Sequence, residues 1–487
     1  MSTDKRKIVS HTSIYMLGDI LRRGVSLIML PIYTRYLTPA DYGVVELLSM
    51  LLDVTSIIFS ARVGQAVFRF YCTAESESDK KGVISSALTL SIIMNGIGTI
   101  AIITFSGPLA LAVFSDIGFK SYISLFAITM FLAPLAEIPL LHIRAQQKPW
   151  LFLIFSITKL VLQLSLNIYF VVVLELHVEG VIYSAVISGI IMAVILSGYS
   201  ISKTGFSPSK SIAKSLFSFS LPLKIASLGS FYMTFGDRYI LNIYTDLTQV
   251  GIYSLGYKFG FVFLLLTWDP FQKMWDAEKY EIFKKDTAKH IYQKVFIYTS
   301  SILILVGLCI SLFSKDLLRI MADPSFLDAY KIVPIIITAY LFQAWTRYCN
   351  MGILLEQKTM QIAYGEMIGV LVITLAYFTL IPLYGIYGAA WSTVAGFAAR
   401  FYWTNMKSRQ LYNMELPWSK ISLVALVAVF IYFLSTLSPD GIIQSIVFRT
   451  VLLTAFIIIF FLLPILSRSE KEEIWVKIRN RRGILRS

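Results

Sequence analysis

The chain has 487 residues, of which 56% are hydrophobic, 14% aromatic and only 15% charged, and its mean hydropathy is +0.71. This composition excludes an ordinary soluble globular protein and predicts an all-α polytopic membrane protein. The net charge of +14 does not require a nucleic-acid partner, because Lys and Arg collect on the cytoplasmic side of membrane proteins. We therefore expect membrane lipids as partners and no nucleic acid.

Cofactor chemistry has no signal in the sequence. Cys72, Cys309 and Cys349 are isolated from one another, which provides neither a disulfide framework nor a paired zinc or redox motif. The chain also contains no P-loop, HExxH or GxSxG motif. We expect no cofactor, no metal site and no enzymatic activity.

Hydropathy predicts about fourteen transmembrane helices, each close to the roughly 20 apolar residues that cross a bilayer. Uniformly apolar runs of this length are not typical of barrel strands. In chain order the predicted spans are 11–34, 42–65, 83–105, 121–142, 151–173, 179–200, 216–243, 250–271, 292–313, 332–352, 362–381, 385–404, 419–437 and 442–466.

The distribution of Lys and Arg predicts the orientation of these helices. If the N-terminus lies in the cytoplasm, the cytoplasmic segments contain 27 basic residues and the opposite segments five. Because cytoplasmic loops are enriched in Lys and Arg, this ratio predicts that both termini are cytoplasmic and that the number of spans is even.

The chain also repeats itself weakly. The segment "YLTPADYGVVELLSM" matches "IYTDLTQVGIYSLGY", which places Gly43 against Gly251 at a spacing of 208 residues. "AQQKPW" matches "LEQKTM", which places Gln147 against Gln357 at a spacing of 210, and "EGVIYSA" matches "YGIYGAA" at a spacing of 205. Three matches in one order at similar spacings indicate a duplicated six-helix unit.

An even-numbered unit enters the membrane twice in the same sense, which predicts two parallel six-helix lobes. We place the N-terminal lobe at 1–205, the C-terminal lobe at 206–410, two additional helices at 411–467 and a basic cytoplasmic tail at 468–487. Two lobes with a cavity between them are typical of alternating-access transporters.

Three segments carry a family resemblance: "LPIYTRYLTPADYGVVELLSMLLD", "GQAVFRFY" and "SLPLKIASLGSFYMTFGDRYILNIYTDLTQVGIYSLGYKFG". They resemble the polysaccharide-transport family of the multidrug/oligosaccharidyl-lipid/polysaccharide exporter superfamily, which includes O-antigen and capsule-repeat flippases. The most specific part surrounds Asp237, Arg238, Gly251 and Tyr253.

This resemblance implies a flippase of the bacterial inner membrane, with a multidrug-exporter-like fold. The implied substrate is a polyprenyl-pyrophosphate-linked oligosaccharide used for O-antigen, capsule or a related polysaccharide. A polysaccharide polymerase or a chain-length regulator is a candidate partner. In lipid II flippases of the same superfamily two helices beyond the first twelve help to form a groove for the lipid tail, and the last two helices here are expected to do the same.

Basic residues inside the predicted spans are candidates for a cationic cavity that binds the pyrophosphate, because charged groups in a membrane are costly and usually functional. Local ion pairs and snorkelling towards the membrane surface are alternative explanations for each of them. The candidate substrate-binding residues are Arg22, Arg23, Lys159, Lys224, Arg238, Lys258, Arg347 and Arg400.

Carboxylates inside the spans raise the question of ion coupling. Glu46, Asp53 and Glu366 are candidates for a proton or sodium site, and the alternative is that they neutralise neighbouring basic residues. Pro31 and Pro222 lie in the two repeat-related helices and are candidate hinges, because proline breaks the backbone hydrogen bonding of a helix.

Two other functions remain open. A multidrug or cation antiporter of the same superfamily would favour an acidic cavity, and the excess of basic residues inside the spans argues against it. A membrane glycan polymerase or ligase commonly has a large periplasmic loop with catalytic groups, and the predicted loops are all short.

Overall fold

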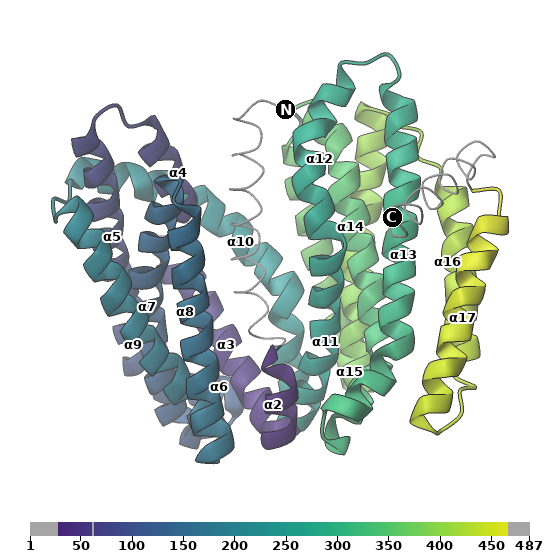
Figure 1. Cartoon of the computed structure of the whole chain (residues 1–487), viewed down its shortest axis with the longest axis horizontal. Helices are drawn as coiled ribbons and strands as arrows, with labels where there is room; N and C mark the ends of the chain where they lie inside the picture. The colour runs from purple at the N-terminus through teal and green to yellow at the C-terminus, as the bar shows by residue number, and fades with distance from the viewer. Residues whose placement is uncertain (1–27, 61–62, 466–487) are drawn as a thin grey trace, which may run out of the picture. The chain divides into compact units, whose positions relative to one another are not determined.

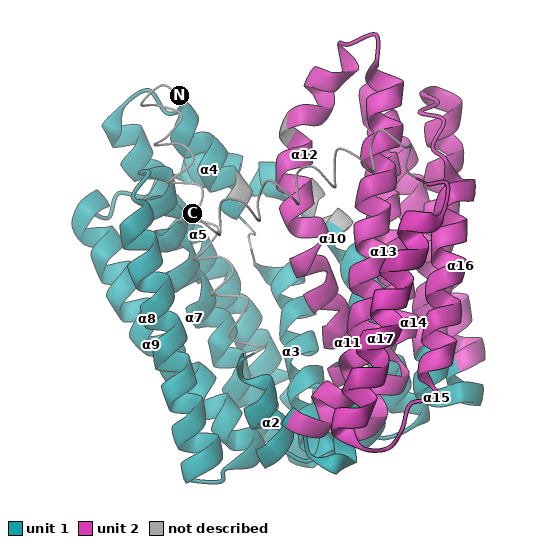
Figure 2. Cartoon of the chain, turned by 45° about the vertical axis from the view of Figure 1, so that its right-hand side comes forward, with its two compact units in different colours: residues 1–254, 321–326, 381–389 teal, residues 255–320, 327–380, 390–487 magenta. Residues whose placement is uncertain are grey.

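A computed structural model of the chain describes residues 28–60 and 63–465. All regular elements in these residues are helical, which confirms the all-α fold class. Contacts between the helices divide the chain into two compact units (Figure 2). Unit 1 comprises 1–254, 321–326 and 381–389, and unit 2 comprises the remaining residues.

Unit 1 contains the helices from α2 to α10 and the start of α11 (Figure 1). Short stretches of 3-10 helix (η1, Ile117–Phe119) and π-helix (η2, Ile168–Val173) extend two of them. The α-helices are α2 (Leu30–Tyr36), α3 (Pro39–Phe59), α4 (Gly64–Thr73), α5 (Glu77–Thr104), α6 (Ser106–Phe114), α7 (Lys120–Ala145), α8 (Pro149–Asn167), α9 (His177–Thr204), α10 (Lys210–Tyr244) and α11 (Leu247–Leu266).

Helix α7 is the centre of the apolar core of unit 1. Its residue Ile138 packs in a cluster with buried side chains of α4, α5 and α10, among them Val67 and Leu216. On the same helix, Leu140 packs in a second cluster with Phe152 of α8 and with side chains of α9. Because α7 contributes to both clusters, it holds together the helices that surround it in Figure 1.

Unit 2 contains the end of α11 and all later helices, apart from the segments 321–326 and 381–389. A 3-10 segment, η3 (Pro324–Lys331), precedes α14 at an angle of 44°. The α-helices are α12 (Trp268–Phe283), α13 (Ala288–Met321), α14 (Val333–Leu355), α15 (Met360–Leu411), α16 (Trp418–Ser435) and α17 (Ile442–Leu462).

Helix α15, 52 residues long, consists of two helices joined at a kink, and these two halves form a hairpin. Gly385 leaves the helical conformation with φ 53° and ψ −126°, a left-handed region that glycine enters without steric cost. The indole Nε1 of Trp403 donates to the backbone oxygen of Gln361 at 3.1 Å. Residues so far apart in one straight helix would be separated by about 60 Å, so the two halves fold back on each other.

The described residues contain ten helices that are long and apolar enough to span a membrane, or eleven if η3 and α14 form one span. The chain is therefore a multi-pass membrane protein, and the predicted number of fourteen is not established. Three features explain the difference. Most of the first predicted helix lies outside the described residues. Helix α10 is less apolar than the helices counted as spans, and α15 contains both the eleventh and the twelfth predicted spans.

Local structure supports the predicted repeat at its first match. The side chain of Thr38 accepts a hydrogen bond from the backbone of Asp41 and caps α3, and 208 residues later Asp246 accepts from the backbone of Gln249 at the start of α11. One turn into α3, a Cβ on Gly43 would lie 2.1 Å from the Leu247 oxygen. Glycine at this position therefore permits direct contact between the α3 and α11 backbones.

This contact is reciprocal. A Cβ on Gly251 would lie 1.9 Å from the oxygen of Pro39, and Pro39 precedes Gly43 by the same four residues that separate Leu247 from Gly251. Because real Cβ atoms do not approach this closely, both helices need glycine. The sequence match at this point therefore reflects matching contacts.

The second match is also visible in the backbone, and the third is not. Gln147 and Gln357 both end a helix with φ 56°, a conformation that is uncommon outside glycine. By contrast, Gly180 lies inside α9, whereas Gly385 has left-handed φ. The two glycines of the third match therefore occupy different local conformations.

The division into units differs from the predicted lobe boundary at residue 205. Helix α10 belongs to unit 1, and its Leu216 lies in the core cluster of α4, α5 and α7. Helix α11 passes from unit 1 to unit 2 after Ser254. The two six-helix lobes remain a prediction based on the repeat.

Candidate functional site

Unit 2 brings together two of the predicted cationic residues, Arg347 and Arg400. Arg400, on the second half of α15, forms an ion pair with Glu366 on the first half, and its Nη2 lies 2.6 Å from Oε1. Arg347, on α14, interacts electrostatically with both Glu366 and Arg400. The fold-back of α15 therefore creates a cluster of two guanidinium groups and one carboxylate from three helical segments.

Arg347 has few partners in this cluster. Within the described part of the chain its one hydrogen bond runs to the amide oxygen of Gln272 on α12, at 3.5 Å. The same oxygen accepts a shorter bond, 2.8 Å, from the indole of Trp268. A guanidinium has five N–H donors, so most of those on Arg347 are available to a ligand.

Unused acceptor atoms lie around the arginine cluster. Gln343 and Asn350 flank Arg347 at helical spacings of four and three residues on α14. Their side-chain oxygens, and Oε2 of Glu366, are buried with no hydrogen-bond donor among the described residues. Such groups are costly to bury unless a ligand or water satisfies them.

An apolar groove of about 560 Å³ lies in the same unit, between α13, α14 and α16. Aromatic and aliphatic side chains form most of its wall, including Phe342, Trp345, Phe401, Trp418 and Leu426. Helix α14 contributes Phe342 and Trp345 to the groove and Arg347 to the polar cluster. Unit 2 thus contains a polar and an apolar region on shared helices, as an amphiphilic ligand requires.

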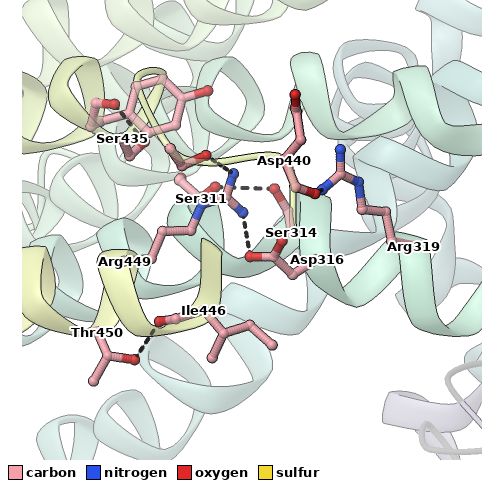
Figure 3. A network of polar contacts seen from close by, with 11 residues as sticks. Ser311, Ser314, Asp316, Arg319, Ser435, Asp440, Ile446, Arg449 and Thr450 are labelled. Carbon is pink, nitrogen blue, oxygen red and sulfur yellow. Dashed lines mark hydrogen bonds and ion pairs between the residues drawn. The ribbon is translucent and has the colours of Figure 1, made fainter. Parts of the chain in front are cut away.

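A buried ion pair holds the last two helices on unit 2 (Figure 3). Arg449 of α17 donates from Nη1 to the carboxylate of Asp316 on α13 at 2.5 Å. Next to it, Arg319 of α13 donates to the backbone oxygen of Asp440, between α16 and α17, at 3.1 Å. Because α16 forms one wall of the apolar groove, this anchor also supports the groove.

Unit 1 contains a second cavity of about 560 Å³, whose lining combines polar and charged side chains with apolar ones. Asp53 of α3 and Glu137 of α7 line it, together with Asn95 of α5 and several serine hydroxyl groups. Glu46 lies seven residues before Asp53, on the same face of α3. The structure therefore places one predicted coupling residue in an acidic cavity and a second on the helix face that lines it.

Arg238 is buried in unit 1 and has a local partner. Its Nη1 donates to the carboxylate of Asp237 at 2.8 Å, and the Tyr253 hydroxyl donates to the other carboxylate oxygen at 2.5 Å. The Arg238 and Asp237 side chains are 1% and 0% exposed. This is the geometry of the local ion pair that the sequence left open as an alternative to cavity lining.

The structure places the remaining predicted residues separately. Lys224 is buried in α10 and its Nζ lies 5.2 Å from the centre of the Phe217 ring. Lys159 is half-buried on α8 and Lys258 is half-buried on α11. Arg22 and Arg23 lie outside the described residues.

The two candidate hinge prolines occupy different positions. Pro31 lies at the start of α2, where its missing N–H removes no helical hydrogen bond. Pro222 lies inside α10, where proline removes one. Their roles as hinges remain predictions.

A family model described as "Polysaccharide biosynthesis protein" matches residues 8–267, more than half of the chain. The chain belongs to this family. An uncharacterized membrane protein of Methanocaldococcus jannaschii, MJ1068, is 25% identical over 354 residues, which cover 67% of this chain and 68% of that protein.

Two solved structures show the fold of the superfamily. The lipid II flippase MurJ superposes with a TM-score of 0.66 at 13% identity, covering 93% of this chain and 99% of MurJ. A multidrug resistance MATE transporter of the MOP superfamily superposes with a TM-score of 0.64 at 14% identity, covering 80% of this chain and 95% of the transporter. Both likenesses concern the fold.

The family match confirms the predicted membership in a polysaccharide family, and the fold is like that of the exporter superfamily to which the sequence was compared. The family associates the chain with polysaccharide biosynthesis, and its transport activity is a proposal. The cargo is a separate question, which depends on the residues of the site.

Sequence reasoning missed the polar partners of the cluster. Gln272, Gln343 and Asn350 are neutral, so a search for charged groups passed over them, although an amide in an apolar helix is itself a signal. Asp316 was missed because it lies next to Lys315 near a predicted span end, where a carboxylate needs no special explanation.

Proposed function

We propose that this protein is a flippase that moves a polyprenyl-pyrophosphate-linked oligosaccharide across the bacterial inner membrane, for O-antigen, capsule or a related polysaccharide. Family membership associates the chain with polysaccharide biosynthesis. The observation that carries the proposal is the Arg347 and Arg400 cluster of unit 2. Two guanidinium groups with unused donors suit a pyrophosphate, because Arg binds phosphate oxygens through charge-assisted hydrogen bonds.

The apolar groove supports a lipid-linked cargo. A polyprenyl chain is insoluble in water, so its transporter must keep the tail in an apolar environment while the charged head crosses. The groove between α13, α14 and α16 offers such an environment within the unit that contains the arginine cluster. In the proposed mechanism the head binds the cationic residues, the tail stays in lipid or in the groove, and a conformational change exposes the site to the opposite side.

The acidic cavity of unit 1 supports a coupling site. Carboxylates with hydroxyl and amide oxygens form a set that binds protons or small cations, and Asp53 and Glu137 line this cavity with Asn95. We propose that uptake of a proton or sodium ion there drives the transport cycle. Replacing both carboxylates, as Asp53→Asn and Glu137→Gln, should remove the dependence of transport on an ion gradient.

The flippase proposal is tested by deleting the gene in its host. Surface polysaccharide should be lost, and lipid-linked repeat units should accumulate on the cytoplasmic side until the intact protein is restored. Rescue should fail with Arg347→Glu, which reverses a charge of the cluster, provided that this variant reaches the membrane at normal levels. Normal surface polysaccharide in the deletion strain would contradict the proposal.

A multidrug or cation antiporter is the second candidate, favoured by the acidic cavity and by the fold shared with a MATE transporter. Proteoliposomes that contain the purified protein distinguish the two. An antiporter would move ethidium against an imposed sodium or proton gradient, whereas the flippase would translocate a fluorescent short-chain prenyl pyrophosphate and leave ethidium untouched.

A further inference from the structure

The ion pair between Glu366 and Arg400 is incomplete. Carboxylate and guanidinium groups often pair through two parallel contacts, but here only Oε1 of Glu366 meets Arg400. Oε2 is buried, with no donor among the described residues. One half of the carboxylate is therefore unsatisfied, as is one oxygen of Asp316 in its pair with Arg449, so accessibility is what distinguishes the two pairs.

The pair is also accessible. The Arg400 and Glu366 side chains are 13% and 25% exposed, whereas those of two buried pairs, Arg238 with Asp237 and Arg449 with Asp316, are 5% exposed or less. A ligand can therefore approach Arg400 without first unfolding its surroundings.

Glu366 balances more than one positive charge. It attracts both Arg400 and Arg347, which repel each other. Within the described residues Arg400 makes one ion pair, and Arg347 makes one long hydrogen bond to a neutral amide and also interacts electrostatically with Asp269. Without Glu366, Arg400 would lose its ion pair and would still be repelled by the guanidinium of Arg347, which is costly in the interior of a membrane protein.

We propose that Glu366 is an exchangeable counter-ion. In the empty transporter it neutralises Arg400 and, together with Asp269, Arg347, and the pyrophosphate of the cargo displaces it and binds both guanidinium groups. This inference rests on the proposed function and identifies the residues that recognise the head of the cargo. A pyrophosphate offers several acceptor oxygens where Glu366 offers one. It therefore outcompetes Glu366 at Arg400, although Glu366 belongs to the same chain and is always close to the arginine.

The incomplete geometry suits reversible exchange. A fully satisfied pair would keep the site closed to the cargo, because the cargo would have to break two good contacts before it made any. A site with no carboxylate would bind the cargo more tightly and release it more slowly. Glu366 therefore lowers the affinity of the site and helps the cargo to leave.

Binding of geranylgeranyl pyrophosphate to the purified full-length protein in lipid nanodiscs tests this inference. Glu366→Gln keeps the size of the side chain and removes its charge. We therefore expect it to bind geranylgeranyl pyrophosphate at least about five-fold more tightly than the wild type does. Arg400→Gln and Arg347→Gln should each weaken binding about ten-fold or more. Glu366→Asp retains the charge, and its affinity should remain near that of the wild type.

Glu356→Gln is the matched control, because it removes a carboxylate from the same unit at an exposed position. Its affinity should not change. Thermal unfolding of every variant verifies folding, and geranylgeraniol measures the contribution of the tail alone.

The outcomes separate the two proposals. Weaker or unchanged binding in Glu366→Gln, with weaker binding in Arg400→Gln, would overturn the counter-ion role and leave the flippase proposal standing. Tightening in Glu366→Asp as large as that in Glu366→Gln would also overturn it, because the charge is retained. If the wild type binds geranylgeranyl pyrophosphate no better than geranylgeraniol, the recognition of an anionic head fails, and with it the basis of the proposed function.

Discussion

Two arginine–carboxylate pairs in unit 2 differ in their surroundings. Arg449 and Asp316 are sealed between α13 and α17, with side chains 5% and 2% exposed. Arg400 and Glu366 join the two halves of α15 and are 13% and 25% exposed. Both pairs have short contacts, so distance does not distinguish them.

The difference in burial separates a structural role from a functional one. A sealed pair cannot reach a ligand, and losing one partner leaves the other as an unpaired charge in an apolar setting. An accessible pair can exchange its partner and has less effect on folding. Charge inside a membrane helix is therefore informative only together with accessibility.

The largest expected effect is that of Arg449→Met. It removes the charge, leaves Asp316 buried without its partner, and should lower the free energy of unfolding by about 3–5 kcal/mol. Thermal unfolding of the purified protein in detergent measures the change. If the unfolding temperature falls no further than in Arg400→Gln, burial does not determine which of the two ion pairs contributes more to stability.

The double variant Asp316→Leu and Arg449→Met is the matched control. It replaces both charges with apolar groups, which is often neutral for a buried pair. We expect it to recover most of the lost stability, and failure to do so would mean that shape rather than charge holds α17 in place.

Arg400→Gln is the second test of the comparison. Its partner Glu366 is partly exposed and can be solvated, so we expect a loss of stability of about 1–2 kcal/mol, less than for Arg449→Met. Transport of the cargo should nevertheless fall about ten-fold or more. Normal transport by Arg400→Gln in proteoliposomes, at normal protein levels, would show that Arg400 does not bind the cargo.

The groove that the sealed pair supports can be tested separately. Ala425 lines the groove on α16, and Ala425→Phe should fill part of it and reduce transport several-fold with a change in stability of less than about 1.5 kcal/mol. Val427 lies on the same helix outside the groove lining, so Val427→Phe is the control. Equal transport in the two variants would show that the groove does not hold the cargo.

The sequence predicted the fold class because long apolar runs in water-soluble proteins are rare and their length matches the bilayer. It also matched Gly43 with Gly251 as equivalent positions of the repeat, but it did not predict that α3 and α11 touch at these glycines. It could not predict which charges pair. Asp316 and Arg449 are 133 residues apart, and only the packing of α17 on α13 brings them together.

Arg238 is a second residue whose ion-pair partner the sequence could not predict. Sequence reasoning grouped it with Arg347 and Arg400 because all three lie in apolar helices. The structure gives Arg238 a buried ion-pair partner next to it in the chain, whereas Arg347 donates a hydrogen bond to a neutral amide and interacts with carboxylates without a direct ion pair among the described residues. Whether a basic residue in a span has a buried partner depends on tertiary packing, which hydropathy does not contain.

The smallest expected effect completes the series with a pair at the surface of unit 2. Glu281 near the end of α12 and Lys284 directly after it are 68% and 69% exposed. The hydrogen bond from Lys284 lowers the pKa of Glu281 below its usual value. A lowered pKa stabilises the folded state above the usual pKa of the group, and this contribution is lost as the pH falls through the lowered value. At neutral pH both partners are charged but solvated, and exposed pairs of this kind contribute little. Lys284→Gln should therefore leave the unfolding temperature at pH 7 unchanged. A decrease comparable to that of Arg400→Gln would show that accessibility does not determine how much an ion pair stabilises this fold.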